Sequence, residues 1–304
     1  MFSWLSKRVQ GIRGNNPHDR ESGGKRGGLT QGTVVVTGAA QGFGRAIAEV
    51  FADRGWQVGA FDVDVERLEA WVAEWGNANS IDRHARGTIV AGNLDVRDEH
   101  SWENSLGQFT AQHGGGINVL VNNAGILYAG DFAERGSYER DSQLVDVNVK
   151  GVLFGARAAL PYLSKAVGGA HMVNLCSASA IYGTPDMATY SATKFAVRGI
   201  TEALEVEWAA RGVQVSSIVP LYANTNMIAE DRTAGMDRLG VHNTPKQIAE
   251  KVLAVVESGR TTPACVHHGV GLQANLLLQS SHFSPAFLTR FINGKLVYGG
   301  KIRF

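Results

Sequence analysis

A tyrosine and a lysine four residues apart are the side chains of this sequence best suited to proton transfer. Tyr190 and Lys194 open a predicted helix, so their spacing puts both on one helix face. To act as a base near neutral pH, the pKa of Tyr190 would have to fall by about three units, roughly 4 kcal/mol. A cation held close by favours that fall. Such a pair also arises by chance on helices, so it indicates chemistry only together with its neighbours.

A hydroxyl group is expected close to this pair. Asn174-Leu175-Cys176-Ser177 ends the predicted strand that precedes Tyr190. Ligands of open α/β sheets bind at the carboxyl ends of the strands. Ser177 is therefore predicted to hold a substrate oxygen beside Tyr190.

A glycine-rich turn near the start of the chain is suited to bind phosphate. It runs Thr37-Gly38-Ala39-Ala40-Gln41-Gly42-Phe43-Gly44, between a β-branched strand and an amphipathic helix. Glycines let backbone N–H groups approach a pyrophosphate, and the helix N-terminus adds its positive dipole end. The residues predicted to bind a dinucleotide here are Gly38, Gln41, Gly42, Phe43 and Gly44.

An acidic residue bears on the choice of dinucleotide. Asp62 ends the next predicted strand, 18 residues after Gly44. A carboxylate at about this distance accepts hydrogen bonds from the ribose 2′-hydroxyl and repels a 2′-phosphate. Gln41 stands where a cation would have favoured such a phosphate, and residues 61–64 contain no cation. The sequence therefore favours NAD(H) over NADP(H).

Alternating strands and helices would position these residues. Apolar β-branched runs predict strands at 32–37, 57–61, 88–94, 118–121, 170–176, 213–219 and 263–267. Helical periodicity predicts helices at 43–53, 65–75, 99–113, 138–165, 188–211 and 244–258. Regular βαβ alternation gives a parallel sheet with helices on both faces. We predict a single doubly wound α/β domain of the Rossmann type over residues 30–268.

The composition is that of a globular protein. Of the 304 residues, 44% are hydrophobic and 19% are charged, and the net charge is +1. This balance excludes a mainly disordered chain and gives no case for nucleic-acid binding over the whole surface. No apolar run of about 18 residues is present, so no transmembrane helix is expected.

The two cysteines indicate neither a disulfide framework nor a metal site. Cys176 and Cys265 lack zinc spacing, and no metal is predicted. Both lie in apolar, strand-like runs. They are therefore predicted to be reduced core thiols of a cytoplasmic protein.

Both ends of the chain are basic. Residues 1–29 are expected to form a flexible extension, and the first 28 residues carry a net charge of +4. No acidic residue follows Glu257, and residues 269–304 form a basic, apolar C-terminal extension. The N-terminal extension is either a solvated arm or a weak contact with a membrane surface. The C-terminal extension either packs on the domain or touches anionic lipid.

Taken together, these motifs resemble the short-chain dehydrogenase/reductase family over about residues 30–268. The glycine-rich turn matches the family's TGxxxGxG pattern, and residues 122–125 match its NNAG segment. Asn148 matches a helix asparagine of the family. Ser177 precedes Tyr190 by the family spacing of 13 residues, and Tyr190 and Lys194 match YxxxK.

The resemblance implies catalytic roles. Tyr190 would be the acid/base that exchanges a proton with the substrate oxygen, and Ser177 would hydrogen-bond that oxygen. Lys194 would bind the nicotinamide ribose and lower the pKa of Tyr190. Asn148 would hold a water that links Lys194 to bulk solvent as a proton relay.

The resemblance also implies cofactor contacts, with one departure from the family pattern. Asp95 would meet the edge of the adenine ring, and Asn122 and Ala124 would line the cofactor path. Thr225 matches the threonine that binds the carboxamide. Leu221 stands where the family usually has a glycine, so it is expected to crowd the nicotinamide or to wall the substrate pocket.

Loops at the carboxyl edge of the sheet are expected to set substrate specificity. Their side chains are mostly apolar, which favours a hydrophobic secondary alcohol or ketone over a sugar phosphate. Alternatively, these side chains only pack the flap between residues 221 and 243. The candidates are Ser177, Tyr182, Met187, Leu221, Tyr222, Met227 and Ile228, with residues 127–133 opposite.

The sequence thus predicts an NAD(H)-dependent oxidoreductase that interconverts a secondary alcohol and a ketone. Two alternatives stay open: an NADPH-dependent carbonyl reductase, and a catalytically idle nucleotide-binding protein on the same fold. The complete set of Ser177, Tyr190, Lys194 and Asn148 favours an active enzyme. The family likeness further implies a homodimer or homotetramer formed through the helices at 138–165 and 188–211.

Overall fold

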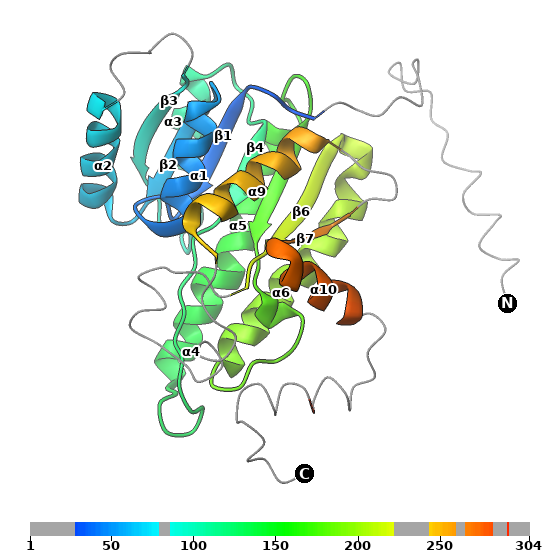
Figure 1. The fold of residues 1–304 in the computed structure, drawn as a ribbon. Helices are drawn as coiled ribbons and strands as arrows, with labels where there is room; N and C mark the ends of the chain where they lie inside the picture. Colours follow the sequence, from blue (N-terminus) through cyan, green and yellow to red (C-terminus); the bar gives the residue numbers. More distant parts are fainter. Residues whose placement is uncertain (1–27, 79–85, 222–242, 260–264, 282–290, 292–304) are drawn as a thin grey trace, which may run out of the picture.

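A parallel sheet of seven strands organises the chain (Figure 1). The computed structural model describes residues 28–78, 86–221, 243–259, 265–281 and 291. Within these residues the strand order is β3-β2-β1-β4-β5-β6-β7. The strands are β1 (Thr33–Thr37), β2 (Gln57–Asp62), β3 (Thr88–Asn93), β4 (Val119–Asn122), β5 (Ala170–Leu175), β6 (Val213–Val219) and β7 (His267–Gly269).

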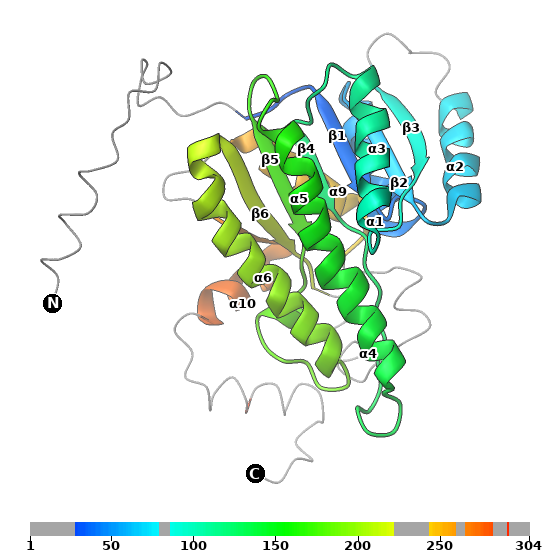
Figure 2. The same cartoon turned by 180° about the vertical axis from the view of Figure 1, so that it is seen from behind.

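Helices cover both faces of this sheet (Figures 1 and 2). One face carries α1 (Gly42–Asp53), α2 (Val65–Ala78) and α9 (Pro245–Ser258); the other carries α3 (Glu99–Gln112), α5 (Gly151–Leu163) and α6 (Ala188–Trp208). Val34 and Val36 of β1 pack in the core under α1 and α9, whereas Val35 packs under α3 and α5. This two-residue alternation of a strand buried on both sides confirms the predicted doubly wound fold.

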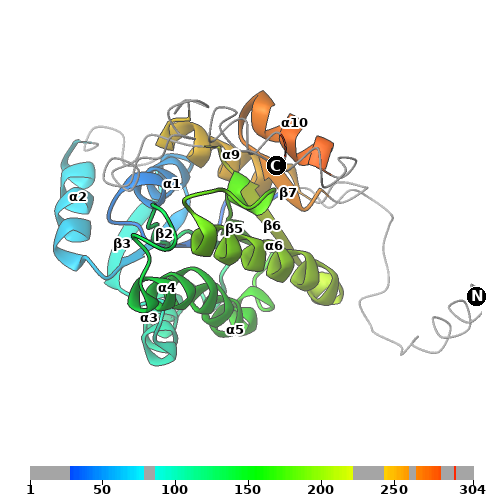
Figure 3. The same cartoon turned by 90° about the horizontal axis from the view of Figure 1, so that it is seen from below.

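The predicted helix at 138–165 is interrupted. It consists of α4 (Tyr138–Val145), a π-helical turn (Asp146–Lys150) and α5. Seen from below, α4, α5 and α6 lie on one side of the sheet, and α1, α9 and α10 lie on the other (Figure 3). The π turn carries the buried Asn148, whose side chain bonds backbone groups outside the helix. The predicted helical stretch is therefore present, with one turn widened at residues 146–150.

The last strand differs from its prediction. Among the described strands, β7 pairs only with β6 and lies at the edge of the sheet, with Ser217 opposite His267. It begins at His267 instead of residue 263, and residues 260–264 lie outside the described residues. Cys265 precedes this strand and is exposed, whereas Cys176 is buried. The prediction of a core thiol was wrong for Cys265 because an edge position leaves it open to solvent.

The first part of the C-terminal extension packs on the domain. α10 (Gly271–Ser281) follows β7, and its Ala274 and Leu278 are buried. Leu278 joins a cluster that includes Cys176 and Val197. The N-terminal extension up to residue 27 and residues 282–304, except 291, lie outside the described residues. Among the helices that the structure describes, none has the length and apolar character needed to cross a bilayer.

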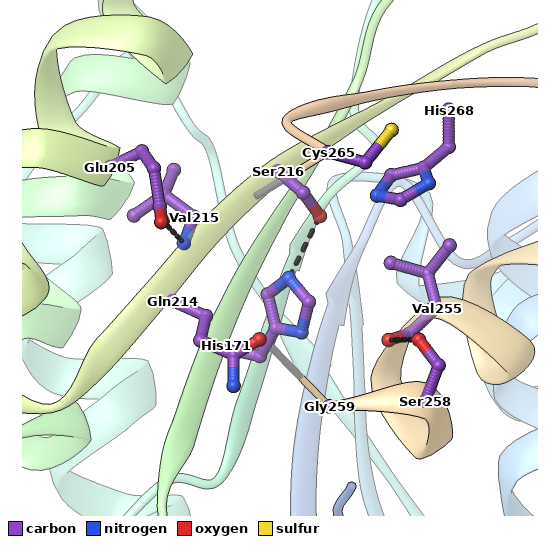
Figure 4. Close-up of a pocket in the computed structure, with 10 residues that line it drawn as sticks. All are labelled: His171, Glu205, Gln214, Val215, Ser216, Val255, Ser258, Gly259, Cys265 and His268. Atoms are coloured by element: carbon purple, nitrogen blue, oxygen red, sulfur yellow. Dashed lines mark hydrogen bonds between the residues drawn. The ribbon is translucent and has the colours of Figure 1, made fainter. Parts of the chain in front are cut away.

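A histidine is buried between β5 and β6, close to their amino ends. His171 is 4% exposed, and its Nε2 lies 2.8 Å from the Oγ of Ser216. It lines a cavity of about 20 Å³ together with His268 and Glu205 (Figure 4). Burial, helped by the nearby His268, lowers the pKa of His171 to about 3. Burial also lowers the pKa of His268 to about 4, so both rings are neutral at ordinary pH.

The buried histidine predicts a loss of stability in acid. The unfolded chain takes up a proton at the ordinary histidine pKa of about 6.5, whereas folded His171 does so only near 3. The free energy of unfolding should therefore fall as the pH drops through this window, by up to ~1.4 kcal/mol per pH unit for His171. His171→Gln should flatten that slope in urea unfolding measured across this range.

A matched control is His100→Gln, because His100 is exposed on α3. This variant should keep the slope of the parent protein. A slope that is unchanged in His171→Gln would contradict the account of a histidine held neutral by burial.

Candidate active site

The glycine-rich turn, Asp62 and the Tyr190–Lys194 pair line a single cleft of about 710 Å³. Its walls come from segments that follow β1, β2, β3, β4 and β5, so it lies at the carboxyl edge of the sheet. The predicted site residues found in its lining are Gly38, Gln41, Gly42, Phe43, Asp62, Asp95, Ala124, Tyr190 and Lys194. Residues distant in sequence thus converge on one cleft, whereas the predicted residues Gly44, Asn122, Asn148 and Ser177 are not part of its described lining.

The turn after β1 has a shape that only glycine permits. Gly38 has a φ of +66°, and a Cβ atom added there would lie 2.8 Å from the Cα of Ala124. A Cβ added at Gly44 would lie 2.1 Å from the carbonyl oxygen of Gly38. Gly44 does not line the cleft; it lets α1 pack directly on the turn. The turn thus lies directly on the N-terminus of α1, and backbone N–H groups at a helix N-terminus are suited to bind a pyrophosphate.

Asn123 holds this turn through hydrogen bonds. It was not predicted individually from the sequence. Its Nδ2 donates to the carbonyl oxygens of Thr37 (2.8 Å) and Gly38 (3.0 Å). Asn122, which was predicted to line the cofactor path, does not line the cleft. Its side chain is buried, and its Nδ2 donates to the Oδ1 of Asn174 at 2.9 Å. Successive residues at a strand end point to opposite sides, so only one of the two asparagines can face the turn.

Asp62 is held in place by backbone donors. Its Oδ2 accepts a hydrogen bond from the N–H of Ala40 (2.9 Å), and its Oδ1 accepts one from the N–H of Asp64 (3.0 Å). Asp64 lines the same end of the cleft. Two carboxylates therefore face this end, which disfavours an anionic group such as a 2′-phosphate.

Asp95 forms a close ion pair with a residue that was not predicted. The guanidinium of Arg97 lies 2.6 to 3.1 Å from both carboxylate oxygens of Asp95. This pair lowers the pKa of Asp95 and keeps it charged. Both residues line the cleft, so a ligand at Asp95 also meets Arg97. Among the described residues, no group of three or more histidine, cysteine or acidic side chains could hold a metal ion.

Tyr190, Ser177 and Lys194 come together at the end of β5. Lys194 is 6% exposed; its Nζ donates to the carbonyl oxygen of Leu175 (3.0 Å) and lies 5.5 Å from the centre of the Tyr190 ring. Burial lowers the pKa of Lys194. Burial raises the pKa of Tyr190 to about 12, although the Ser177 side chain opposes this shift.

The expectation that Lys194 lowers the pKa of Tyr190 applies to the protein with its cofactor bound, and it stays a prediction. In the chain by itself, the cost of removing a phenolate from water outweighs the opposing effect of Ser177, with the ammonium group of Lys194 5.5 Å from the centre of the ring. That ammonium group is already engaged by the Leu175 carbonyl. A lowered pKa therefore requires a further positive charge beside the phenol.

Asn148 ties the segment after β4 to α6. Its Oδ1 accepts from the N–H of Ile126, and its Nδ2 donates to the carbonyl oxygen of Ile126, both at 2.9 Å. The Nδ2 also donates to the Oγ1 of Thr193 at 3.2 Å, next to Lys194. A Cβ added at Gly125 would lie 3.2 Å from the Oδ1 of Asn148 and 3.8 Å from the Nζ of Lys194. The Oδ1 of Asn148 and the Nζ of Lys194 thus both lie close to the position that a side chain at residue 125 would occupy.

The predicted substrate residues are placed less uniformly. Met187 is buried against Leu127, Ala129 and Tyr190 instead of lining the cleft. Its prediction was made from its position in the loop, which does not reveal the direction of a side chain. Tyr182 and Leu221 are partly buried and are also not part of the lining. Four of the predicted residues lie outside the described residues, namely Tyr222, Thr225, Met227 and Ile228.

Comparisons with known proteins agree with this geometry. The family model described as short chain dehydrogenase matches residues 32–235. A 2,5-dichloro-2,5-cyclohexadiene-1,4-diol dehydrogenase of Sphingobium indicum is 36% identical over 196 residues, covering 64% of this chain and 74% of that protein.

Solved structures share the fold. A 3-ketoacyl-(acyl-carrier-protein) reductase of Brucella melitensis, complexed with NADH, superposes with a TM-score of 0.69 and 26% identity, covering 79% of this chain and 96% of the other. An alcohol dehydrogenase of Thermococcus sibiricus, complexed with 5-hydroxy-NADP, superposes with a TM-score of 0.66 over 79% of this chain and 94% of the other; at 23% identity it shows the fold alone.

The chain belongs to the short-chain dehydrogenase family, as its motifs indicated. It is an NAD(P)-binding oxidoreductase of that family.

The close packing at Gly44 predicts a strong effect of a single methyl group. Gly44→Ala should weaken dinucleotide binding at least ~10-fold and lower the free energy of unfolding by about 1–3 kcal/mol, because the new Cβ meets the Gly38 carbonyl. Fluorescence titration with NAD⁺ and urea unfolding measure the two effects.

The control is Gly76→Ala on α2, where an added Cβ has no neighbour within 4 Å. This variant should bind normally and be more stable by about 0.5–1 kcal/mol. Normal binding by Gly44→Ala would show that the turn is not a dinucleotide cradle.

Proposed function

We propose that this chain is an NAD(H)-dependent dehydrogenase/reductase that interconverts a secondary alcohol and a ketone on a largely apolar substrate. The observation that carries the proposal is the shared cleft, in which Tyr190 and Lys194 line the same cavity as the glycine-rich turn and Asp62. A bound nicotinamide cofactor would supply hydride transfer, and the protein would supply orientation and proton transfer.

The cofactor would be held by residues along the carboxyl edge of the sheet. The turn from Gly38 to Gly44 would bind the pyrophosphate through backbone N–H groups at the start of α1. Asp62 would accept hydrogen bonds from the adenosine ribose, and Asp95 would meet the edge of the adenine ring. Thr225, which lies outside the described residues, would bind the carboxamide.

Proton transfer would be the task of the residues around β5. Tyr190 would accept a proton from the substrate alcohol, or donate one to the ketone oxygen, while Ser177 hydrogen-bonds that oxygen. The influence of Ser177 on the pKa of Tyr190 supports their action on the same atom. A positive charge on the bound cofactor would favour the phenolate and so lower the high pKa of Tyr190. Lys194 would bind the nicotinamide ribose. Asn148 would hold a water that links Lys194 to bulk solvent as a proton relay.

NAD(H) is proposed over NADP(H) on the basis of charge. Asp62 and Asp64 line the end of the cleft that would receive the adenosine ribose. Arg97, a cation in the described lining, is engaged by Asp95. The relatives include proteins with NADH and with an NADP derivative, so the proposal rests on this chain's own carboxylates.

The proposed substrate is an apolar alcohol or ketone. The cleft near Tyr190 is lined by the apolar side chains of Ile126, Val147 and Leu175. The Sphingobium relative, named for a cyclic diol, supports an alcohol substrate.

A homodimer or homotetramer in the cytoplasm is proposed as the setting. Exposed apolar residues on the helices expected to form the interface, Leu153, Phe195 and Val206, support self-association. Weak membrane contact through the basic termini remains a proposal, and nucleic acid is not proposed as a partner.

Removing the phenol tests the catalytic proposal. Tyr190→Phe should lower kcat at least ~100-fold, because the acid/base is lost, while the Kd for NAD⁺ changes by less than about threefold. Steady-state kinetics on a panel of secondary alcohols and fluorescence titration measure the two quantities. Tyr138→Phe removes the hydroxyl of a residue that is 98% exposed and should leave both unchanged. Retained turnover in Tyr190→Phe would end the assigned role, and a parent protein that binds NAD⁺ without any turnover would favour the idle alternative.

Cofactor preference can be tested by titration with both dinucleotides. NAD⁺ should bind at least ~10-fold more tightly than NADP⁺, and Asp62→Asn should narrow that ratio by removing a negative charge while keeping an acceptor for Ala40. Asp64→Asn is the matched control. It should narrow the ratio of NAD⁺ to NADP⁺ affinity less, because Asp64 is exposed and does not hold the glycine-rich turn. Tighter binding of NADP⁺ by the parent protein would favour the carbonyl reductase alternative.

A further inference from the structure

Residues of the segment after β4 alternate between a small buried core and the cleft. Leu127 and Ala129 are buried against Met187 and Tyr190, whereas Ile126 and Tyr128 line the cleft. This is the alternation of an extended backbone. The segment therefore brings the ring of Tyr128 into the cleft that contains Tyr190.

Tyr128 forms a polar pair with a glutamine of α4. The Oη of Tyr128 donates to the Oε1 of Gln143 at 2.9 Å, and both side chains line the cleft. One turn further along the helix, Val147 lines it as well. A polar pair thus lies in a part of the cleft that is otherwise lined by apolar side chains such as Ile126 and Val147.

The pair is held in one arrangement from outside the cleft. The guanidinium carbon of Arg140 lies 5.1 Å from the centre of the Tyr128 ring. Arg140 does not line the cleft; it lines a smaller pocket to which Tyr128 also contributes. With its ring fixed by Arg140 and its hydroxyl by Gln143, Tyr128 needs little rearrangement to meet a ligand.

The pair has hydrogen-bonding capacity left for a ligand. Because the Tyr128 hydroxyl proton is given to Gln143, the phenol oxygen keeps acceptor capacity. The Nε2 of Gln143 is a donor whose contact with the Oε1 of Glu139 is long, at 3.5 Å. One acceptor and one donor, both on neutral side chains, match a hydroxyl group better than a carboxylate or a phosphate.

We infer that Tyr128 and Gln143 bind a second, uncharged oxygen of the substrate, so that the preferred substrate is a diol or a hydroxyketone with an apolar body. This inference rests on the proposed function, in which Tyr190 and Ser177 take the reacting oxygen. Tyr128 and Gln143 are specificity-determining residues that hold the other end of the molecule.

Cyclohexanol and the cyclohexanediol regioisomers are suitable probes, because they share an apolar ring and differ by one hydroxyl group. Calorimetric titration of the full chain saturated with NADH gives their Kd values, and turnover with NAD⁺ gives kcat/KM. At least one diol should bind about tenfold more tightly than cyclohexanol. Tyr128→Phe and Gln143→Leu should each remove most of that advantage and leave the Kd of cyclohexanol within about twofold.

Tyr138→Phe is the matched control, since it removes a tyrosine hydroxyl at the start of α4 outside the cleft. It should leave the preference unchanged. Equal Kd values for all the diols and cyclohexanol would overturn the inference. An equal loss of affinity for both compound classes in Tyr128→Phe would overturn it as well, because it indicates a structural role. Failure of the proposed function would look different: the diol preference in binding would persist, but no alcohol would yield NADH.

Discussion

The candidate site depends on the direct contact between the glycine-rich turn and the start of α1. A Cβ at Gly44 would lie 2.1 Å from the Gly38 carbonyl, so the helix can sit on the turn only where this side chain is absent. Asn123 fixes the same turn from β4 through the Thr37 and Gly38 carbonyls. Because Asp62 also binds the turn, through the N–H of Ala40, three adjacent strand ends are joined at one point.

A second set of contacts links the two halves of the cleft. Asn148, presented by the π-helical turn, bonds both backbone groups of Ile126 and the hydroxyl of Thr193. The segment that carries Tyr128 is thereby attached to the helix that carries Tyr190 and Lys194. This link would set the distance between Tyr190, at the reacting end of a substrate, and Tyr128, at its far end. Such a distance is held more firmly by helices and hydrogen bonds than by a loop.

Periodicity and motif order predicted the sheet, its helices and the residues that converge on the cleft, because strand order at the carboxyl edge brings those positions together. What they could not predict is the direction of individual side chains. Asn122 and Asn123 are neighbours of the same residue type, yet Asn122 bonds a side chain within the sheet and Asn123 bonds the glycine-rich turn. Met187 occupies a cleft loop but is buried in a small core, and Cys265 precedes an edge strand. The π turn contains one more residue than an α-helical turn. The pattern of apolar residues does not reveal it, because tertiary hydrogen bonds accommodate that residue.

The environment of Tyr190 also determines how the unloaded protein treats a carbonyl compound. A phenol whose pKa is near 12 remains protonated at any physiological pH, so it can polarise a ketone but cannot remove a proton from the carbon next to it. In molecules without a bound dinucleotide, Tyr190 would therefore meet a carbonyl compound only as a proton donor, and its use as a base would wait for the positive charge of the cofactor.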